Sequence, residues 1–393
     1  MAAPEGTVEE AEKVDFKIEL AHQRFQYQQP GKSDKEKGQL QKAILEVIFA
    51  EKLAPFYLQV CQELGWPLDE ARLAEMETAN KKQLQELDAK VTDAKENLGD
   101  TEVKTALLAK ADYLCKLGDR EAAAAAYKDT EDKTTGSGPK LDLVFSMLRL
   151  DMANNDWQAV RTGIAKAKKL GDEGGDWERK NRLKVYEAVF LMATRSFKEA
   201  AHLFLDSMAT FSTNELFAYE RCIFYAVITS IITLDRVSLR TKVVDAPEIL
   251  TVIDAIPHLS SYLNCFYKCQ YKQFYQAFVP IMGQLREDRF LHAHFRYYVR
   301  EVRCIAYSQF LESYKSVTLQ SMADSFGVGI GFMDQELSEF IVAGRLPAKI
   351  DKVAGIIETN RPDTKNAQYQ QTIKSGDLLL NRLQKLSKVI DIE

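Results

Sequence analysis

The order of periodic segments between Arg296 and Asn360 constrains the fold more than any other part of the sequence. Apolar residues recur at helical spacing through RYYVREVRCIAYSQFLESYKSV, through a short segment at 319–326 and, beyond a glycine-rich turn, through a third segment at 333–341. After Gly344, the β-rich runs AKIDK and GIIETN are able to pair as a hairpin. A helix, a helix–turn–helix and a hairpin in this order predict a winged-helix domain.

Charge on the second helix of the helix–turn–helix indicates what this winged helix contacts. A DNA-recognition helix carries Lys, Arg or Asn toward phosphates and base edges. Here the helix carries Asp334, Glu336 and Glu339, and no basic residue precedes Arg345. Because acidic side chains repel the phosphate backbone, the sequence predicts a winged helix that contacts protein and not nucleic acid.

Length and composition limit the class of protein. The 393 residues carry a net charge of −5 and are 46% hydrophobic, which predicts two or three packed domains and argues against a disordered chain. The longest apolar run, Cys222 to Leu234, has 13 residues; a membrane span needs about 20, so a buried helix and no membrane partner are expected. The start, MAAPEGTVEE, lacks the apolar core of a signal peptide, and the six cysteines have no framework spacing. These features predict reduced thiols in the cytoplasm and nucleus.

The N-terminal quarter divides into three segments. Residues 1–38 are mostly polar and end in QQPGKSDKEKG, which predicts a poorly ordered entry segment. A helix is expected from about Leu40 to Ala54, where Pro55 would break or kink it. From residue 69 to residue 98, charged residues surround an apolar minority, so a long, exposed amphipathic helix is expected.

A faint internal repeat runs through residues 101–211. Three turn-like strings, GDREA at 118–122, NDWQA at 155–159 and SFKEA at 196–200, begin 37 and 41 residues apart, and apolar residues precede each at matching distances. Each string ends on Ala, which permits close approach of the two helices it joins. The spacing is typical of stacked helix hairpins of the tetratricopeptide kind, with a generic helical bundle as the alternative.

The C-terminal segment TIKSGDLLLNRLQKLSKVIDIE carries an apolar stripe. Its four members are separated by 4, 3 and 4 residues, the a/d spacing of a heptad, and Lys and Arg occupy the other faces. A terminal helix with such a stripe needs a second surface to cover it. It is expected either to fold back on the winged helix or to join a bundle with helices of other chains. The stripe comprises Leu379, Leu383, Leu386 and Ile390.

The histidines do not form a metal-site pattern. His292 and His294 are the one H-x-H pair, a spacing found in zinc-dependent isopeptidases. Val302 and Ile305 stand where such a site needs a Ser and an Asp, so no carboxylate completes a tetrahedral zinc site. A structural or surface role is expected for both histidines, and no metal.

Two further patterns also have a structural explanation. Cys265 and Cys269 lie four residues apart on an expected helix, but no second pair accompanies them, so core packing is expected. The glycines of the G-x-G-x-G string at 327–331 follow no strand and precede no P-loop lysine, so they are expected to form the turn between two helices. The sequence therefore predicts no catalytic residue, no cofactor and no enzymatic activity.

Several stretches resemble a known family. SVTLQSMADSFGV at 316–328, followed by FMDQELSEFIVAGRLPAKIDK, is similar to the PCI module shared by the proteasome lid, the COP9 signalosome and initiation factor 3. GDEGGDWERKNRLKVYEAVF at 171–190 and the C-terminal ETNRPDTKNAQYQQTIKSGDLLLNRLQKLS narrow the resemblance to the PCI-domain subunits of the proteasome lid. It covers nearly the whole chain from about Lys37, but neither the entry segment nor the alanine run at 122–126.

The resemblance implies a mainly α fold. A right-handed, tetratricopeptide-like helical solenoid would be followed by a winged-helix PCI domain and a C-terminal helix. Placed on this sequence, the entry segment is 1–38, the solenoid is 39–215, and the PCI domain is 216–360 with the winged helix from about 296. The C-terminal helix is 361–393.

The resemblance also implies where partners bind. In the lid, the winged helices of PCI subunits associate side by side, partly strand to strand, and the C-terminal helices gather into one bundle. This implies that Ile350, Ile356 and Ile357 lie on the wing at the seam. The bundle surface would be Leu379, Leu383, Leu386 and Ile390.

The function implied is that of a non-catalytic scaffold in the lid of the 26S proteasome, which supports ATP-dependent degradation of ubiquitinated proteins. Implied partners are the other PCI subunits, the deubiquitinase subunits of the lid through the helical bundle, and the ATPase base and core particle. A paralogous scaffold of the COP9 signalosome subunit-one type is the alternative. The strings ETNRPD and GDLLLNRLQKLS favour the proteasome.

Overall fold

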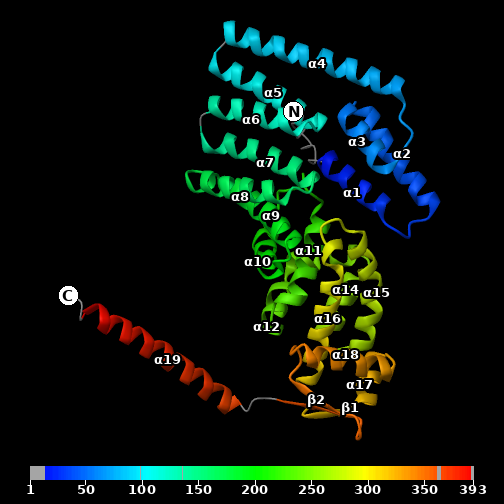
Figure 1. The fold of residues 1–393 in the computed structure, drawn as a ribbon, viewed down its shortest axis with the longest axis vertical. Helices are drawn as coiled ribbons and strands as arrows, with labels where there is room; N and C mark the ends of the chain where they lie inside the picture. The colour runs from blue at the N-terminus through cyan, green and yellow to red at the C-terminus, as the bar shows by residue number, and fades with distance from the viewer. Residues whose placement is uncertain (1–13, 98, 135, 361–363, 391–393) are drawn as a thin grey trace, which may run out of the picture. The chain divides into compact units, whose positions relative to one another are not determined.

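The computed structural model describes residues 14–97, 99–134, 136–360 and 364–390, which form helices and one small sheet (Figure 1). The chain divides into two compact units. The helical unit comprises Met1–Asn264 with Ala277–Tyr298, and the winged-helix unit comprises Cys265–Gln276 with Val299–Glu393. Each unit therefore combines two separate stretches of sequence.

The helical unit begins with four helices, and the first of them and the start of the second lie where the sequence predicted a poorly ordered entry. That prediction is wrong for residues 14–38, while residues 1–13 lie outside the described part. Ile18, Leu20 and Ala21 of the first helix are buried, and Ser33 and Glu36 form a reciprocal capping box that starts the second. Polar residues dominate this stretch, yet its few apolar side chains are buried against the rest of the unit. The helices are α1 (Phe16–Gln28), α2 (Asp34–Ala50), α3 (Ala54–Leu64) and α4 (Glu70–Asn97).

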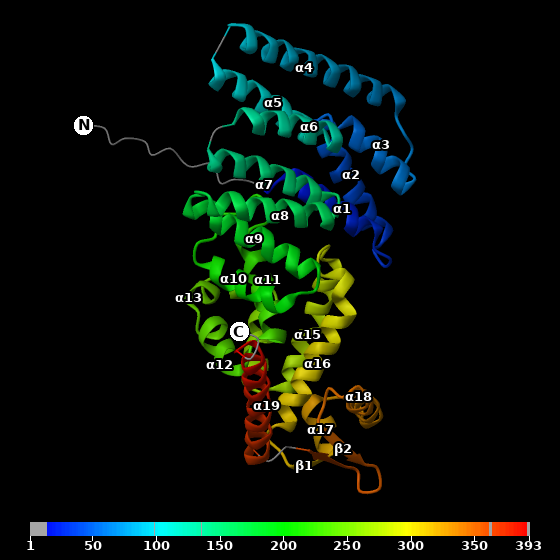
Figure 2. The ribbon, with the colours of Figure 1, turned by 60° about the vertical axis from the view of Figure 1, so that its left-hand side comes forward.

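Three helix hairpins follow, and their turns lie at the three predicted strings. Gly118, Asn155 and Arg195 each have a positive φ, between 60° and 84°, where one helix ends and the next begins. Figures 1 and 2 show α4 to α8 stacked with their axes roughly parallel. The hairpins are α5 (Asp100–Leu117) with α6 (Arg120–Lys133), α7 (Ser137–Ala153) with α8 (Trp157–Asp172), and α9 (Trp177–Ala193) with α10 (Phe197–Met208).

The apolar run at 222–234 forms the buried helix that the sequence predicted. Every residue of α11 (Tyr219–Thr233) from Cys222 to Ile231 is buried. None of the described helices has both the length and the hydropathy that crossing a membrane requires. Short helical turns then lead to the last long helices: α12 (Arg236–Leu239), η1 (Arg240–Val244), α13 (Pro247–Leu250), η2 (Ile253–Ala255), α14 (Leu259–Tyr267), α15 (Tyr271–Glu287), η3 (His292–His294) and α16 (Phe295–Leu311).

A buried ionic cluster holds the start of α1 against the segment before α11. The Asp15 amide donates to the Glu215 carbonyl oxygen (2.8 Å), and Arg149 pairs with both carboxylates, at 3.0 Å and 3.3 Å. Burial by itself raises the pKa of Glu215, but hydrogen bonds from Arg182 and Tyr186 and the charge of Arg149 outweigh burial and lower it. The carboxylate is therefore held ionised, and α1 is fixed to the helical unit by charge as well as by apolar packing.

The winged-helix unit has the predicted order of elements and one strand more. The predicted hairpin is β2 (Ala348–Asp351) and β3 (Ile356–Thr359), and β1 (Ser316–Thr318) joins it in an antiparallel sheet of order β1-β3-β2. The sequence did not predict β1, because three residues are too few for a periodic pattern. The helix–turn–helix is α17 (Leu319–Phe326) and α18 (Ile330–Val342). Gly327, with a φ of +69°, ends α17 as predicted.

The last element is a long helix, as the sequence predicted. Helix α19 (Thr364–Ile390) has 27 residues and spans the whole apolar stripe. At a rise of about 1.5 Å per residue it is roughly 40 Å long. The mainly α fold, with a PCI-type winged helix and a C-terminal helix, is therefore confirmed.

Candidate functional site

The apolar stripe of α19 is exposed on one face of the helix. Leu379, Leu383, Leu386 and Ile390 are 52–63% exposed, and at 100° per residue they lie within about 60° of one another. Burying such a side chain contributes about 1.5–3 kcal/mol, so a continuous stripe of four favours a covering surface. The sequence predicted this stripe from its spacing alone, and the structure adds that the side chains remain uncovered in the chain.

The three wing residues predicted at the seam do not lie on one surface. Ile350 is on the edge strand β2 and is partly exposed, whereas Ile356 and Ile357 are on the central strand β3. Ile357 is 0% exposed, so its side chain belongs to the core of the winged helix and is not available to a partner. The assignment of Ile357 to the seam is therefore wrong. The sequence predicted a two-stranded hairpin, in which β3 would be an edge strand, but β1 pairs with its other side and makes it central.

The free edge of β2 offers main-chain hydrogen bonds. The Asn360 amide donates to the Pro347 carbonyl oxygen (2.8 Å), and hydrogen-bonded pairs alternate along an antiparallel ladder. Lys349 therefore bonds to β3, and the N–H and C=O groups of Ile350 point to the outer edge. An edge with such outward groups is the usual acceptor of an added strand.

Helix α18 presents a less acidic surface than the sequence suggested. Glu336 points inward, where it accepts a hydrogen bond from Tyr307 (2.6 Å) and pairs with Arg303 (2.5 Å). Asp334 pairs with Lys352 of the wing at 3.2 Å. The argument against nucleic acid therefore rests on fewer exposed carboxylates than the three counted in the sequence.

Exposed apolar side chains on the winged-helix unit were not predicted from the sequence. Ile330 and Phe332 lie at the start of α18, Val342 at its end, and Val353 at the tip of the wing. Phe332 and Val342 fall off the face of α18 that the core uses, so the helical spacing already marked these two as surface residues. All four add apolar surface to the same unit that carries the β2 edge.

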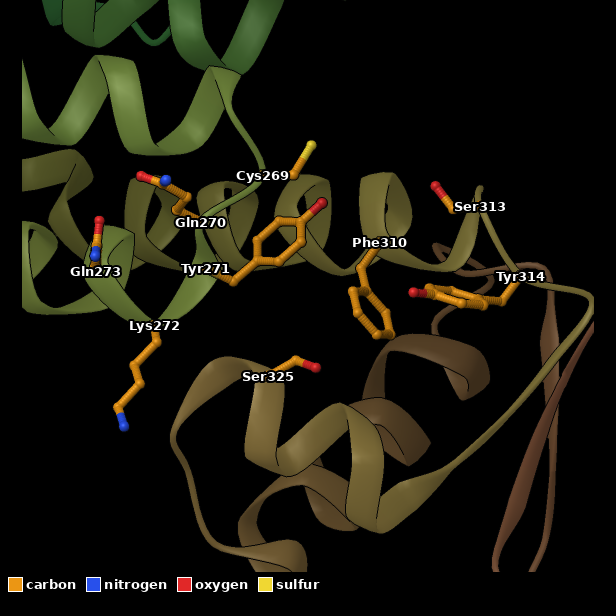
Figure 3. A pocket seen from close by; sticks show the side chains of 9 residues that line it. All are labelled: Cys269, Gln270, Tyr271, Lys272, Gln273, Phe310, Ser313, Tyr314 and Ser325. Atoms are coloured by element: carbon orange, nitrogen blue, oxygen red, sulfur yellow. The ribbon is translucent and has the colours of Figure 1, made fainter.

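A cavity of about 480 Å³ opens beside the start of α15 in the winged-helix unit (Figure 3). Phe310 lies between Tyr271 and Tyr314, with ring centroids 5.6 Å and 5.1 Å away. Cys269 and Ser325 also line the cavity, but none of its lining residues is a His, Asp or Glu. The cavity thus provides aromatic and hydrogen-bonding contacts.

The histidine and cysteine patterns lie in structural positions. A ring nitrogen of His292 lies 2.8 Å from the Arg286 carbonyl oxygen, and one of His294 lies 2.7 Å from that of Ala193. Cys265 is within α14, but Cys269 lies in the turn after it, with a φ of +60°, and not on the same helix as expected. Within the described ranges, no three His, Cys, Asp or Glu side chains converge as metal ligands would.

Family models match three stretches of the chain. The model of 26S proteasome subunit RPN7 matches residues 69–242, and the PCI domain matches residues 281–361. The model of the 26S proteasome regulatory subunit RPN7/PSMD6 C-terminal helix matches residues 368–390, which contain the α19 stripe.

Relatives match over nearly the full length. The 26S proteasome non-ATPase regulatory subunit 6 homolog of Arabidopsis thaliana is 56% identical over 373 residues, 95% of this chain and 96% of that protein. The 26S proteasome non-ATPase regulatory subunit 6 of Oryza sativa subsp. japonica is 53% identical over 388 residues, 99% and 100% of the two chains. The 26S proteasome regulatory subunit RPN7 of Saccharomyces cerevisiae is 34% identical over 397 residues, 95% and 92% of the two chains. These names describe regulatory subunits of the proteasome and do not favour the signalosome alternative.

Proposed function

The chain belongs to the 26S proteasome non-ATPase regulatory subunit 6 family, and on that basis we propose that it is a non-catalytic structural subunit of the regulatory-particle lid. The observation that carries the proposal is similarity over both units and the C-terminal helix, at up to 56% identity. In this role the protein scaffolds lid assembly and supports ATP-dependent degradation of ubiquitinated proteins in the cytoplasm and nucleus.

The two exposed surfaces suit different partners. The stripe of α19 is suited to a helical bundle, in which helices of the lid's deubiquitinase subunits and of other lid subunits would cover it. The winged-helix unit is suited to side-by-side association with other PCI subunits. Contacts with the ATPase base and the core particle complete the proposed set of partners.

Affinity purification of the tagged full-length chain from its native cells tests the proposed function. Mass spectrometry of the co-purified proteins is expected to identify the other lid subunits together with the six ATPases of the base. Recovery of signalosome subunits without ATPases would indicate that the chain is instead the paralogous signalosome scaffold. A chain recovered alone, or with nucleic acid, would contradict the scaffold role.

Strand addition at β2 is the proposed contact between winged helices, and Ile350→Pro tests it. Proline removes the outward N–H of Ile350 but no ladder bond to β3, so the unit is expected to stay folded. Loss of one intermolecular hydrogen bond and the added ring are expected to lower recovery of neighbouring PCI subunits about 5- to 10-fold. Ile350→Thr, which retains the N–H, is the control and is expected to behave as wild type. Undiminished recovery with Ile350→Pro would exclude this edge as the seam.

A further inference from the structure

The cavity of about 480 Å³ in the winged-helix unit is built by three helices of that unit. One wall is Cys269–Gln273, which comprises the turn before α15 and its first residues, and the second wall comes from the end of α16. Ser325 of α17 lies on the third side, and Figure 3 shows Phe310, Tyr314 and Ser325 pointing into the same space. Small-molecule sites have volumes of about 300–1,000 Å³, so this cavity is large enough to hold an aromatic ring.

Two of the three aromatic rings that line the cavity are fixed by the core of the unit. Tyr271 and Phe310 are 6% and 7% exposed, and both pack on Phe326, with ring centroids 4.6 Å and 5.5 Å away. Tyr314 differs from them, because it is 46% exposed and lies at the rim, with its centroid 5.1 Å from that of Phe310. Aromatic rings prefer offset or edge-to-face neighbours at such distances. A further ring that enters the cavity would therefore meet an ordered aromatic wall and cover the exposed part of Tyr314.

Polar side chains at the rim of the cavity have hydrogen-bonding capacity to spare. Gln270, Lys272 and Ser313 are exposed, and their side chains form no hydrogen bond or ion pair with another residue of the described ranges. The Ser325 hydroxyl donates to the Ser321 carbonyl oxygen (2.8 Å), so its oxygen can still accept a hydrogen bond. These groups can pair with a hydroxyl or N–H group that enters the cavity beside the rings.

The charges at the cavity limit the class of ligand. None of its lining residues is an Asp, Glu or His, so an arginine or lysine side chain, or a metal ion, would enter without a counter-charge. An anion inside the cavity would meet only Lys272, which is exposed and therefore screened by water and salt. An aliphatic side chain would fill the space but would leave the rim groups without a partner. An uncharged ring that bears a hydroxyl or N–H group fits both the aromatic wall and the rim.

The open side of the cavity favours a ring that is presented by another protein. Five of the nine lining residues are exposed, namely Gln270, Lys272, Gln273, Ser313 and Tyr314 (Figure 3). Free small molecules are usually buried over about 70–90% of their surface, which this open rim does not provide. A ring carried on a polypeptide meets that requirement, because the rest of the polypeptide covers the rim. Lys272 is the one charged side chain that lines the cavity, so acidic residues beside the ring would complement it.

We propose that this cavity binds a tryptophan or tyrosine side chain of a partner protein, on a segment with acidic residues beside the ring. The ring lies against Phe310 and Tyr314, its N–H or hydroxyl group donates to Gln270 or Ser313, and a neighbouring carboxylate pairs with Lys272 at the rim. Neither the edge of β2 nor the stripe of α19 takes part in this contact. The inference therefore goes beyond the proposed scaffold function and does not depend on it.

Fluorine NMR of a short peptide, titrated with the full-length chain, tests the proposal. The probe is 5-fluorotryptophan between two aspartates, acetylated and amidated at its ends, and saturable broadening of its fluorine signal is expected. The unlabelled tryptophan peptide is expected to displace the probe at a concentration at least 10-fold lower than the same peptide with leucine. Equal competition by the leucine peptide, or no saturable broadening, would overturn the proposal. Equal competition by N-acetyltryptophanamide, which has no acidic neighbours, would indicate a site for free aromatic compounds and would overturn the partner segment.

Three substitutions assign the binding to this cavity. Tyr314→Ala removes the ring at the rim and Ser325→Phe fills the cavity from α17, and each is expected to weaken binding of the peptide at least 5-fold. Lys272→Glu is expected to reverse the charge preference, so that a peptide with two lysines binds more tightly than the peptide with two aspartates. The control Tyr369→Ala removes a tyrosine that is 66% exposed and does not line the cavity, and it is expected to change nothing. Unchanged affinity in Tyr314→Ala or in Ser325→Phe would place the binding elsewhere and overturn the proposal.

Discussion

Replacing Leu383 and Leu386 together with Asp is expected to remove the protein from lid assemblies while its two units stay folded. Both side chains are more than half exposed on α19, so the change costs little in the isolated chain. In a helical bundle the same change would bury two carboxylates without partners, at several kcal/mol. Since about 1.4 kcal/mol is a factor of ten, recovery of the other lid subunits with the tagged chain is expected to fall at least 10-fold.

A matched variant separates the stripe from a general effect of charge. Lys385→Asn with Lys388→Asn lowers the net charge by the same two units but lies on the opposite face of α19. This variant is expected to recover the lid subunits as the wild type does, and the thermal unfolding of both variants is expected to match that of wild type. Normal recovery with the Asp variant, or an equal loss with the Asn variant, would show that the stripe is not the bundle surface.

The largest expected effect on stability comes from Phe326→Ala in the winged-helix unit. Phe326 is 1% exposed, and its ring centroid lies 4.6 Å from that of Tyr271, 5.0 Å from that of Tyr307 and 5.5 Å from that of Phe310. Removing a fully buried phenyl ring costs about 3–5 kcal/mol, because transfer energy is lost and a cavity remains. Hydrogen exchange followed by mass spectrometry is expected to show amides of α16 to α18 exchanging roughly 100- to 4,000-fold faster.

Phe332→Ala is the control for this measurement. Phe332 is 46% exposed in the same unit, so its removal is expected to change the free energy of opening by less than about 1 kcal/mol. Peptides of α5 to α10, in the helical unit, are expected to exchange at the wild-type rate in both variants. Equal exchange in Phe326→Ala and Phe332→Ala would mean that the aromatic cluster does not hold the winged helix together.

Features that the sequence by itself determined are those that depend on neighbours close in the chain. Helical spacing predicted the long α4 and the stripe of α19, and an uninterrupted apolar run predicted the buried α11. Turn strings predicted the three hairpins, since chain reversal is decided by the few residues that must adopt a positive φ or pack closely. The winged-helix order of elements was predicted for the same reason.

Features that only the tertiary structure decided depend on which neighbour covers each face. Spacing places Ile357 on a strand, but only the structure makes that strand central, since β1 pairs with the side of β3 away from β2, and only the structure shows that the Ile357 side chain is buried. Glutamate is usually exposed, yet the Glu336 side chain is held inside by a hydrogen bond from Tyr307 and an ion pair with Arg303, both on α16. Local periodicity specifies which side chains share a face, whereas burial and pairing are properties of long-range contacts, which only the folded chain contains.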